Sequence, residues 1–256
     1  MKKDTKIQWG TVFVLLLFHA GALAAPFFFS WRRLALFFAV WFVCGCLGTC
    51  VWLHRGLTHG GFKTSKPVEC ALVFSATLLL QNPVRWVASH RRHHDNTDKE
   101  GDTHSPKDGW WWSHMGWVYA KNRLMHSSEV EHYAPKLMAD PFYRLMHRIF
   151  WVLPVIFAGL LFWFGGLGHV FTWMCAVVVC WHFTWSVNSF GHAKGRPRNK
   201  WWLGILAWGE GWHANHHRWP WSARHGRRIY QIDVAWYSIR LMKLVGLVWA
   251  IRLPHP

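Results

Sequence analysis

Three long stretches without a single Lys, Arg, Asp or Glu constrain this chain more than any other feature of its sequence. They cover residues 7–31, 34–53 and 149–193. A helix needs about 20 apolar residues to cross a bilayer, and lipid offers no water to unpaired backbone groups. The first two stretches therefore predict one span each. The third predicts two spans that turn at GGLGH, residues 165–169.

The predicted fold is an all-α integral membrane protein with four transmembrane helices and a helical cytoplasmic cap that carries a histidine-rich dimetal site. The spans are expected at about 8–29, 34–53, 149–164 and 170–190. Residues 1–256 are predicted to form a single domain with cytoplasmic parts at 54–148 and 191–256. The N-terminal stretch also has features of a signal peptide, but its apolar run continues to Phe29, so a retained span is expected.

The distribution of positive charge predicts how these helices are oriented. In the four-span arrangement, only Arg32 and Arg33 of the 29 Lys and Arg residues lie in a loop opposite the N-terminus. Positive residues mark the cytoplasmic side, so both termini and the metal site are predicted to be cytoplasmic. Contact with anionic lipid explains the net charge of +17, and no separate basic patch indicates a nucleic-acid partner.

Two further stretches are predicted to lie against the membrane without crossing it. Residues 70–84 are uncharged but short, which is typical of a re-entrant or half-buried helix. Residues 229–253 mix apolar and charged side chains, which favours an amphipathic helix on the membrane surface.

Histidines are grouped at three places along the chain. One pair is His54 and His59, and two HxxHH triplets follow at 90–94 and 213–217. Positions i, i+3 and i+4 share one face of a helix, so each triplet points three imidazoles the same way. The i, i+5 spacing of the pair fits an α-helix less well.

If residues 70–84 do not cross, these histidines and His192 all emerge on the cytoplasmic face, where nine imidazoles can ligate two metal ions. Spacing alone does not assign His192. Imidazole suits zinc, copper, iron and nickel, and the lack of cysteine ligands argues against a structural zinc site. Isolated histidines are interpreted as polar residues without a ligand role; these are His19, His114, His126, His132, His147, His225 and His255.

Three histidine boxes in this order are typical of one family. HRGLTH (54–59), HRRHH (90–94) and HANHH (213–217) resemble those of membrane fatty acyl desaturases, in the stearoyl-CoA desaturase branch that includes bacterial delta-9 enzymes. The similarity runs from about residue 40 to residue 222. It includes WWWSHMGW at 110–117 and GEGWHANHHRWPW around the last box.

The resemblance implies roles for further residues. The predicted metal ligands become His54, His59, His90, His93, His94, His192, His213, His216 and His217. TWSVNSFGH, residues 184–192, supplies the ninth ligand and places Asn188 next to one metal through a water molecule. The predicted substrate contacts, which include a kink in the acyl chain, are Gln81, Trp86, Thr184 and Trp185. Carboxylates near the boxes are candidates to orient the imidazoles; these are Asp95, Asp98, Glu100, Asp102 and Glu210.

The implied activity is the insertion of a cis double bond, at the delta-9 position, into a saturated fatty acyl chain. The implied cofactors are two iron ions, which zinc can replace in overexpressed protein. The implied partners are O2, the lipid bilayer and a separate electron donor, either ferredoxin or a b-type cytochrome with its reductase. The expected location is the bacterial inner membrane.

The acyl carrier is the point at which the sequence departs from the family pattern. An Arg-Asp pair that holds coenzyme A in animal relatives is replaced by Ala88 and Ser89. Arg85, Arg91 and Arg92 flank the position and offer compensating charge. The family therefore slightly favours acyl-CoA, with an acyl-lipid as the close alternative and acyl carrier protein as a further one.

Two other functions are consistent with part of the pattern. A lipid hydroxylase shares the histidine boxes, and box spacing separates it poorly from a desaturase. A histidine-rich metal-binding membrane protein such as a transporter is the more distant alternative. It predicts charged residues within the spans, where such residues mark ion routes, and these spans carry none.

Overall fold

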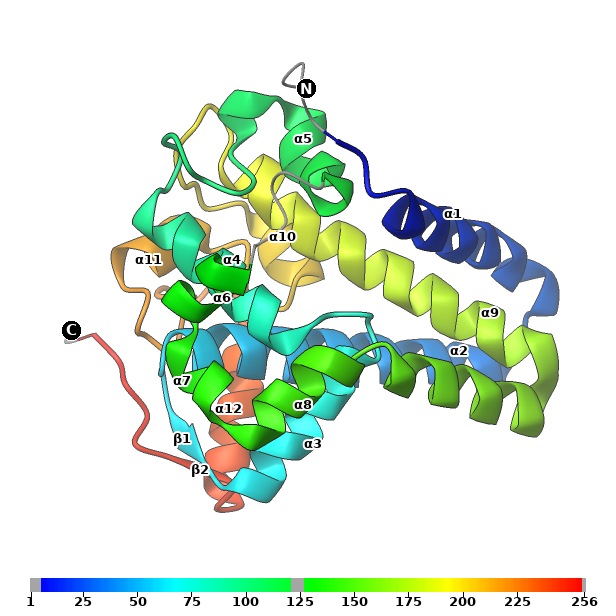
Figure 1. The fold of residues 1–256 in the computed structure, drawn as a ribbon. Helices are drawn as coiled ribbons and strands as arrows, with labels where there is room; N and C mark the ends of the chain where they lie inside the picture. The colour runs from blue at the N-terminus through cyan, green and yellow to red at the C-terminus, as the bar shows by residue number, and fades with distance from the viewer. Residues whose placement is uncertain (1–5, 121–126, 255–256) are drawn as a thin grey trace.

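The computed structural model describes residues 6–120 and 127–254, and most of these residues are helical. The long helices extend together from one end of the molecule, and short helices gather at the other end (Figure 1). The elements are α1 (Trp9–Ala24), η1 (Ala25–Phe28), α2 (Trp31–Val40), η2 (Trp41–Thr58), β1 (Lys63–Thr64), α3 (Lys66–Thr77), α4 (Pro83–Asp95), η3 (Pro106–Asp108), α5 (Trp110–His114), η4 (Gly116–Tyr119), α6 (Ser127–Tyr133), α7 (Pro135–Ala139), α8 (Pro141–Ile149), α9 (Val152–Gly191), α10 (Trp201–Leu206), α11 (His213–Arg218), α12 (Val234–Leu244) and β2 (Val248–Trp249). The two short strands pair antiparallel, with Lys63 opposite Trp249.

Three helical segments within the described residues are long and apolar enough to cross a membrane. They are Trp9–Phe28, Trp31–Thr58 and Val152–Gly191. The third is broken at Gly166, which has a φ of 66° and lies inside the predicted GGLGH turn. Glycine reaches positive φ without a steric cost, so it can separate two helical arms. The helical class is confirmed, and separate crossing by each arm stays a prediction.

The second long segment changes its hydrogen-bonding pattern at Trp41. α2 is an α-helix, whereas η2 is a π-helix in which each bond reaches five residues back. The Thr58 hydroxyl also donates to a carbonyl oxygen five residues back, that of Leu53, at 2.6 Å. π-helical turns occur often at functional sites. The first histidine pair lies at the end of η2, which indicates a functional site there.

The stretch expected as one half-buried helix, residues 70–84, is divided between two helices. α3 ends at Thr77, and α4 begins at Pro83 because Asn82 caps it with its side chain and proline suits the first helical position. α3 packs against η2 at Gly48, where an added Cβ would lie 2.6 Å from the Ala76 backbone nitrogen. The single-helix prediction is therefore wrong in its bounds.

The surface helix expected at 229–253 is shorter than predicted. Only Val234–Leu244 is helical, and β2 follows it. One face of α12 is buried through Ile239, while Leu241 and Leu244 are exposed on the other. This one-sided burial agrees with an amphipathic helix, and its contact with a membrane stays a prediction.

Candidate metal centre

The first histidine pair lies at the end of η2. His54 lies within this helix and His59 follows it directly. The backbone N–H of His59 donates to the carbonyl oxygen of His54 at 3.3 Å, and the two ring centroids are 5.1 Å apart. An i, i+5 bond turns both imidazoles to the same side, so the wider helix removes the misfit expected of this spacing on an α-helix.

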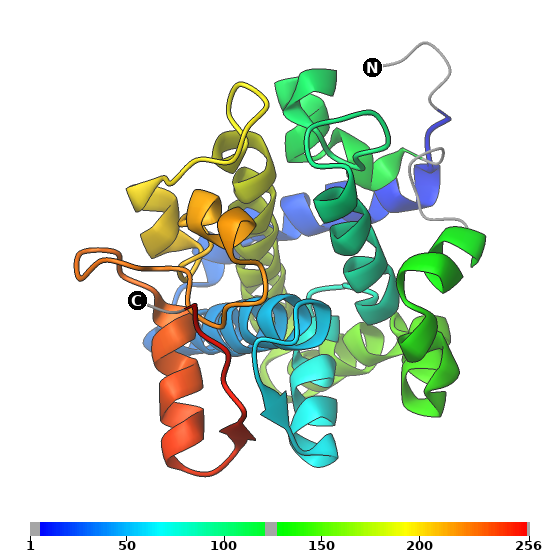
Figure 2. The ribbon, with the colours of Figure 1, turned by 90° about the vertical axis from the view of Figure 1, so that its left-hand side faces the viewer.

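The two HxxHH boxes lie on helices, as their spacing predicts. α4 carries residues 90–94 and α11 carries residues 213–217. His192 is the residue that ends α9. Seen from the end with the short helices, α4 and α11 lie close to the near ends of η2 and α9 (Figure 2), and α4 contacts η2 while α11 contacts α9. The histidines that lie far apart in sequence are thus brought to one place.

Two groups of histidine nitrogens form there, with the ligating atoms of each group within 4.8 Å of one another. The first group is His54, His59, His90, His94 and His216; the second is His93, His192, His213 and His217. Within the second group, facing Nε2 atoms are 2.7 Å apart for His192 and His213. Metal–nitrogen bonds are about 2.0–2.1 Å long, so nitrogens converging at this spacing fit a metal ion between them. All nine predicted ligands come together.

Three buried carboxylates orient histidines of these groups through the outer Nδ1 atom. The pairs are His54 with Glu210 at 2.6 Å, His93 with Asp102 at 2.9 Å, and His192 with Asp98 at 2.8 Å. Such an acceptor fixes the ring orientation and leaves Nε2 free for a metal. The other two candidate carboxylates, Asp95 and Glu100, are exposed.

A fully buried arginine ties the first box to the third. Arg55 is 0% exposed and pairs with Glu210 at 3.0 Å and with Asp233 at 2.9 Å. Asp233 also accepts from the backbone N–H of His225 and caps α12. Because a buried charge is costly without partners, these two carboxylates are what keep Arg55 beside the site.

Burial lowers the pKa of several of the grouped histidines. It lowers the pKa of His94 to about 3, with neighbouring histidines adding to the effect. For the same reasons the pKa of His59, His90 and His213 lies well below 6.5. A neutral imidazole has the lone pair that a metal needs. His59, His90, His94 and His213 are therefore in the ligating state at neutral pH.

Two histidines of the site were not found from the sequence. His225, interpreted above as an isolated polar residue, is 1% exposed, with its ring 4.6 Å from that of His216 and its Nδ1 3.5 Å from Glu210. His225 is therefore not isolated, because the loop before α12 folds back onto the first group. His104 is also buried, and its ring lies 4.4 Å from that of His93. Neither belongs to a box with helical spacing, so the pattern gave no signal.

The other isolated histidines lie outside the two groups where the structure describes them. His19, His182 and His114 form a separate chain, with nitrogen atoms 3.0 and 2.9 Å apart at its two steps. His147 is bonded to Asn82. His132 is exposed. His126 and His255 lie outside the described residues.

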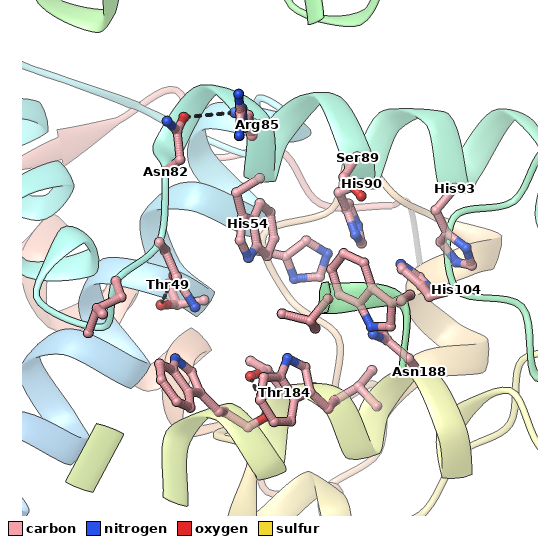
Figure 3. A pocket seen from close by; sticks show the side chains of 18 of the residues that line it. Thr49, His54, Asn82, Arg85, Ser89, His90, His93, His104, Thr184 and Asn188 are labelled. Carbon is pink, nitrogen blue, oxygen red and sulfur yellow. Dashed lines mark hydrogen bonds between the residues drawn. The ribbon is translucent and has the colours of Figure 1, made fainter. Parts of the chain in front are cut away.

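A mostly apolar cavity of about 480 Å³ ends at the histidine groups. Its lining includes all four predicted substrate contacts and the predicted water-mediated metal contact; these are Gln81, Trp86, Thr184, Trp185 and Asn188. Figure 3 shows Thr184 and Asn188 on the α9 side of this space and Asn82, Arg85 and Ser89 on the α4 side. Gln81 accepts a 2.8 Å bond from Thr49, and Trp86 stacks on His90 at 5.2 Å between centroids.

Comparison with known proteins agrees with this geometry. The sequence model of the family described as fatty acid desaturase matches residues 31–244. The sn-2 palmitoyl-lipid 9-desaturase of Nostoc sp. (strain 36) is 39% identical, over 94% of this chain and 89% of its own length. The chloroplastic palmitoyl-monogalactosyldiacylglycerol delta-7 desaturase of Arabidopsis thaliana is 36% identical, over 99% and 74%. An acyl-CoA 5-desaturase of Anemone leveillei is 36% identical, over 98% and 84%.

Proposed function

The chain belongs to the fatty acid desaturase family and is an oxidoreductase of that family, and from this premise we propose that it inserts a cis double bond at the delta-9 position of a saturated acyl chain. The observation that carries the proposal is the mostly apolar cavity that ends at two groups of converging histidines. An acyl chain is apolar and long, and burial of its methylenes favours such a site.

We assign two iron ions to the two groups. The five-histidine group and the four-histidine group each supply enough nitrogens for one ion, and Asn188 lines the cavity where the resemblance expects a water-mediated contact. Imidazole binds iron and zinc alike, so zinc is expected in overexpressed protein. When bound, the iron pair supplies the activation of O2 that removal of hydrogen from a saturated chain requires.

The chain's own residues place the bond that reacts. Trp86 is stacked on His90, so its indole forms a wall of the cavity beside the first group. The bond from Thr49 holds Gln81 at the same wall, and Thr184 faces them from α9. An acyl chain that bends at this wall keeps one pair of its methylenes next to the metals. Such positioning is a large contribution to catalysis. The apolar lining excludes water from the reacting carbons.

We further propose four spans, with α9 crossing twice around Gly166 and with both termini and the metal centre in the cytoplasm of a bacterial inner membrane. The three apolar helices already make the chain membrane-associated. The separate electron donor is ferredoxin or a b-type cytochrome with its reductase. Positive charge supports an acidic donor: none of the Lys and Arg residues between 192 and 254 is buried, whereas Glu210 and Asp233 are the only acids there and both are buried.

Expression in a desaturase-deficient host tests the activity. Gas chromatography–mass spectrometry of the host's fatty acids should show new cis-monounsaturated chains, absent when His94→Ala is expressed and present with the exposed control His132→Ala. Hydroxylated chains in place of alkenes would identify the lipid hydroxylase instead. No new product from a protein that holds about two iron ions would end the proposal.

A further inference from the structure

The exposed residues of the cavity lining show where the cavity opens to the surface. Among the lining residues that the structure describes, Gly10, Arg85 and Trp151 are exposed and the rest are buried or half-buried. Gly10 lies in the first turn of α1, and Trp151 directly precedes α9. The opening is therefore where two of the apolar helices begin, at the level of the membrane surface.

Aromatic side chains support this level. Trp9 is 70% exposed beside Gly10, and Trp151 is 59% exposed. Exposed tryptophans at the ends of apolar helices are typical of the membrane–water interface. A lipid in the same leaflet can thus pass its acyl chain into the opening while its headgroup remains at the interface.

Of the three arginines of α4, only Arg85 is available to a substrate. Arg91 donates to the backbone oxygen of Tyr133 at 2.9 Å, among other carbonyls. Arg92 donates to a loop carbonyl and pairs with Glu129. Arg85 is exposed, lines the cavity, and forms no ion pair with any residue in 6–120 or 127–254.

The surroundings of Arg85 hold it at the opening and add positive charge. Asn82 accepts from the Arg85 backbone N–H at 3.1 Å and donates to the carbonyl oxygen of His147 at 2.9 Å, which ties the first turn of α4 to the end of α8. Burial, with the charges of Arg85 and Arg148, lowers the pKa of His147. His147 is therefore neutral at pH 7, and the two guanidinium groups supply the positive field.

We propose that the acyl chain that enters this cavity is esterified in a membrane glycerophospholipid, whose phosphate is held by Arg85 at the opening. This inference rests on the proposed function and replaces the acyl-CoA carrier that the sequence slightly favoured. A phosphodiester carries one negative charge and two free oxygens, which match the planar fork of one guanidinium.

Coenzyme A is a poorer match for the described residues at this place. It carries three phosphate groups and a nucleotide at the end of a long arm, and it needs several cations or polar partners outside the cavity. The positions of the family's charged pair hold Ala88 at 0% and Ser89 at 8% exposure, and Arg91 and Arg92 are already engaged. Arg85 is therefore the only α4 arginine left to bind a phosphate, and it can meet one charge of coenzyme A but not all three phosphates.

A binding experiment on metal-free protein tests the phosphate contact without activity. Radiolabelled distearoyl-phosphatidylglycerol and distearoylglycerol, which has no phosphate, are titrated into the purified full chain in detergent. Arg85→Gln should weaken binding of the phospholipid about tenfold and leave the diacylglycerol unchanged, because only a charge-assisted bond is lost. Arg144→Gln, on α8 and exposed but outside the cavity lining, is the matched control and should change neither. Equal phospholipid binding by wild type and Arg85→Gln would overturn the inference.

A kinetic experiment on the iron-loaded enzyme, driven by a small chemical reductant, distinguishes the two carriers. Phosphatidylglycerol in vesicles should gain double bonds, and Arg85→Gln should raise KM about tenfold with little change in kcat. Stearoyl-CoA, offered in lipid-free detergent, should not react. If stearoyl-CoA alone reacts, the inference is wrong while the desaturase function stands. If neither reacts, the proposed function fails and the binding result still decides the phosphate contact.

Discussion

Glu210 is a buried carboxylate that pairs with both a histidine and an arginine of the candidate metal centre. It is 3% exposed and contacts both the Nδ1 atom of His54 and the guanidinium of Arg55. Burial alone would raise the pKa of Glu210, but His54, His225 and Arg55 hold it well below the usual range. One carboxylate therefore orients a predicted metal ligand and pairs with a buried cation.

Replacing Glu210 by Gln should damage stability and metal binding together. Breaking a buried ion pair costs about 3–5 kcal/mol, because the remaining charge is left without its partner. Loss of an orienting acceptor lowers metal affinity about 10–100-fold. Denaturant unfolding and metal analysis after dialysis measure the two effects. Glu131→Gln, an exposed acid on α6, should stay within about 0.5 kcal/mol of wild type; an equal effect in both variants would contradict this role.

The grouped histidines predict how stability of the metal-free protein depends on pH. The pKa values of His90, His94 and His216 are lowered in the folded state, so below pH 6.5 the unfolded chain binds protons that the folded chain does not. The free energy of unfolding should be constant above about pH 6.5 and fall below it, by up to about 1.4 kcal/mol per pH unit for each such histidine. Denaturant titrations from pH 7.5 to 5 check the sign; stability that rises on acidification would refute it.

At the scale of single residues, the sequence predicted which histidines gather better than it predicted their surroundings. The nine histidines could be named as one set because box spacing and family resemblance both depend on local patterns. His225 could not, because only the return of a loop onto His216 brings it to the site. The sequence also could not predict that, among the described residues, Arg92 is paired and Arg85 is not. Arg92 forms an ion pair with Glu129, which only the folded structure brings near it.

Among the elements, the turn between α10 and α11 leaves no room for a side chain at one of its glycines. Gly209 has a φ of +111°, and an added Cβ would lie 2.2 Å from Asp233 Oδ1 and 3.0 Å from a guanidinium nitrogen of Arg55. Gly209→Ala should therefore combine backbone strain with a clash, at a cost of about 2–5 kcal/mol. Gly246→Ala has positive φ but nothing within 4 Å, so about 1–2 kcal/mol is expected. Thermal unfolding should rank the two variants in this order, and the reverse order would show that packing at Gly209 is slack.

Element positions were predictable where composition alone decides them. The apolar runs gave α1 and the two arms around Gly166 to within a few residues. The π-helical turn of η2 was not visible, because Trp41–Thr58 contains no residue type that demands five-residue hydrogen bonds. The start of α4 at Pro83 could have been predicted. Asn82 and Pro83 form a helix start signal, but residues 70–84 were assigned to one helix only because they carry no charge.

At the scale of the molecule, the four-span topology makes a direct prediction. Reporter fusions at residue 66 and residue 256 should both report the cytoplasm, and a fusion near residue 31 should report the outside, because positive residues stay on the cytoplasmic side. Alkaline phosphatase and green fluorescent protein reporters give opposite signals for the two locations. A cytoplasmic signal at 31, or an external one at 66, would separate the histidine boxes by a bilayer and defeat the topology.

The uneven surface charge predicts that electron delivery depends on ionic strength. α11 lies at the end of the molecule opposite the long helices, and its neighbouring exposed charges are positive (Figure 1). Reduction by an acidic ferredoxin should slow steeply between about 50 and 200 mM salt, since screening removes the attraction. Arg218→Glu with Arg228→Glu should slow it further, whereas reduction by a small neutral reagent should not change. Salt-independent reduction by ferredoxin would argue against an electrostatic docking face.

The spread of the histidines along the chain sets the order of events during biosynthesis. Synthesis runs from the N-terminus, and the ribosome completes the third box only at His217, after all three apolar segments have been made. Before the third box begins at His213, the four-histidine group has only His93 and His192. A chain interrupted before its last forty or so residues would contain all three apolar segments but lack the third box. Because each group draws on that box, neither histidine group can be complete until almost the whole chain has been made.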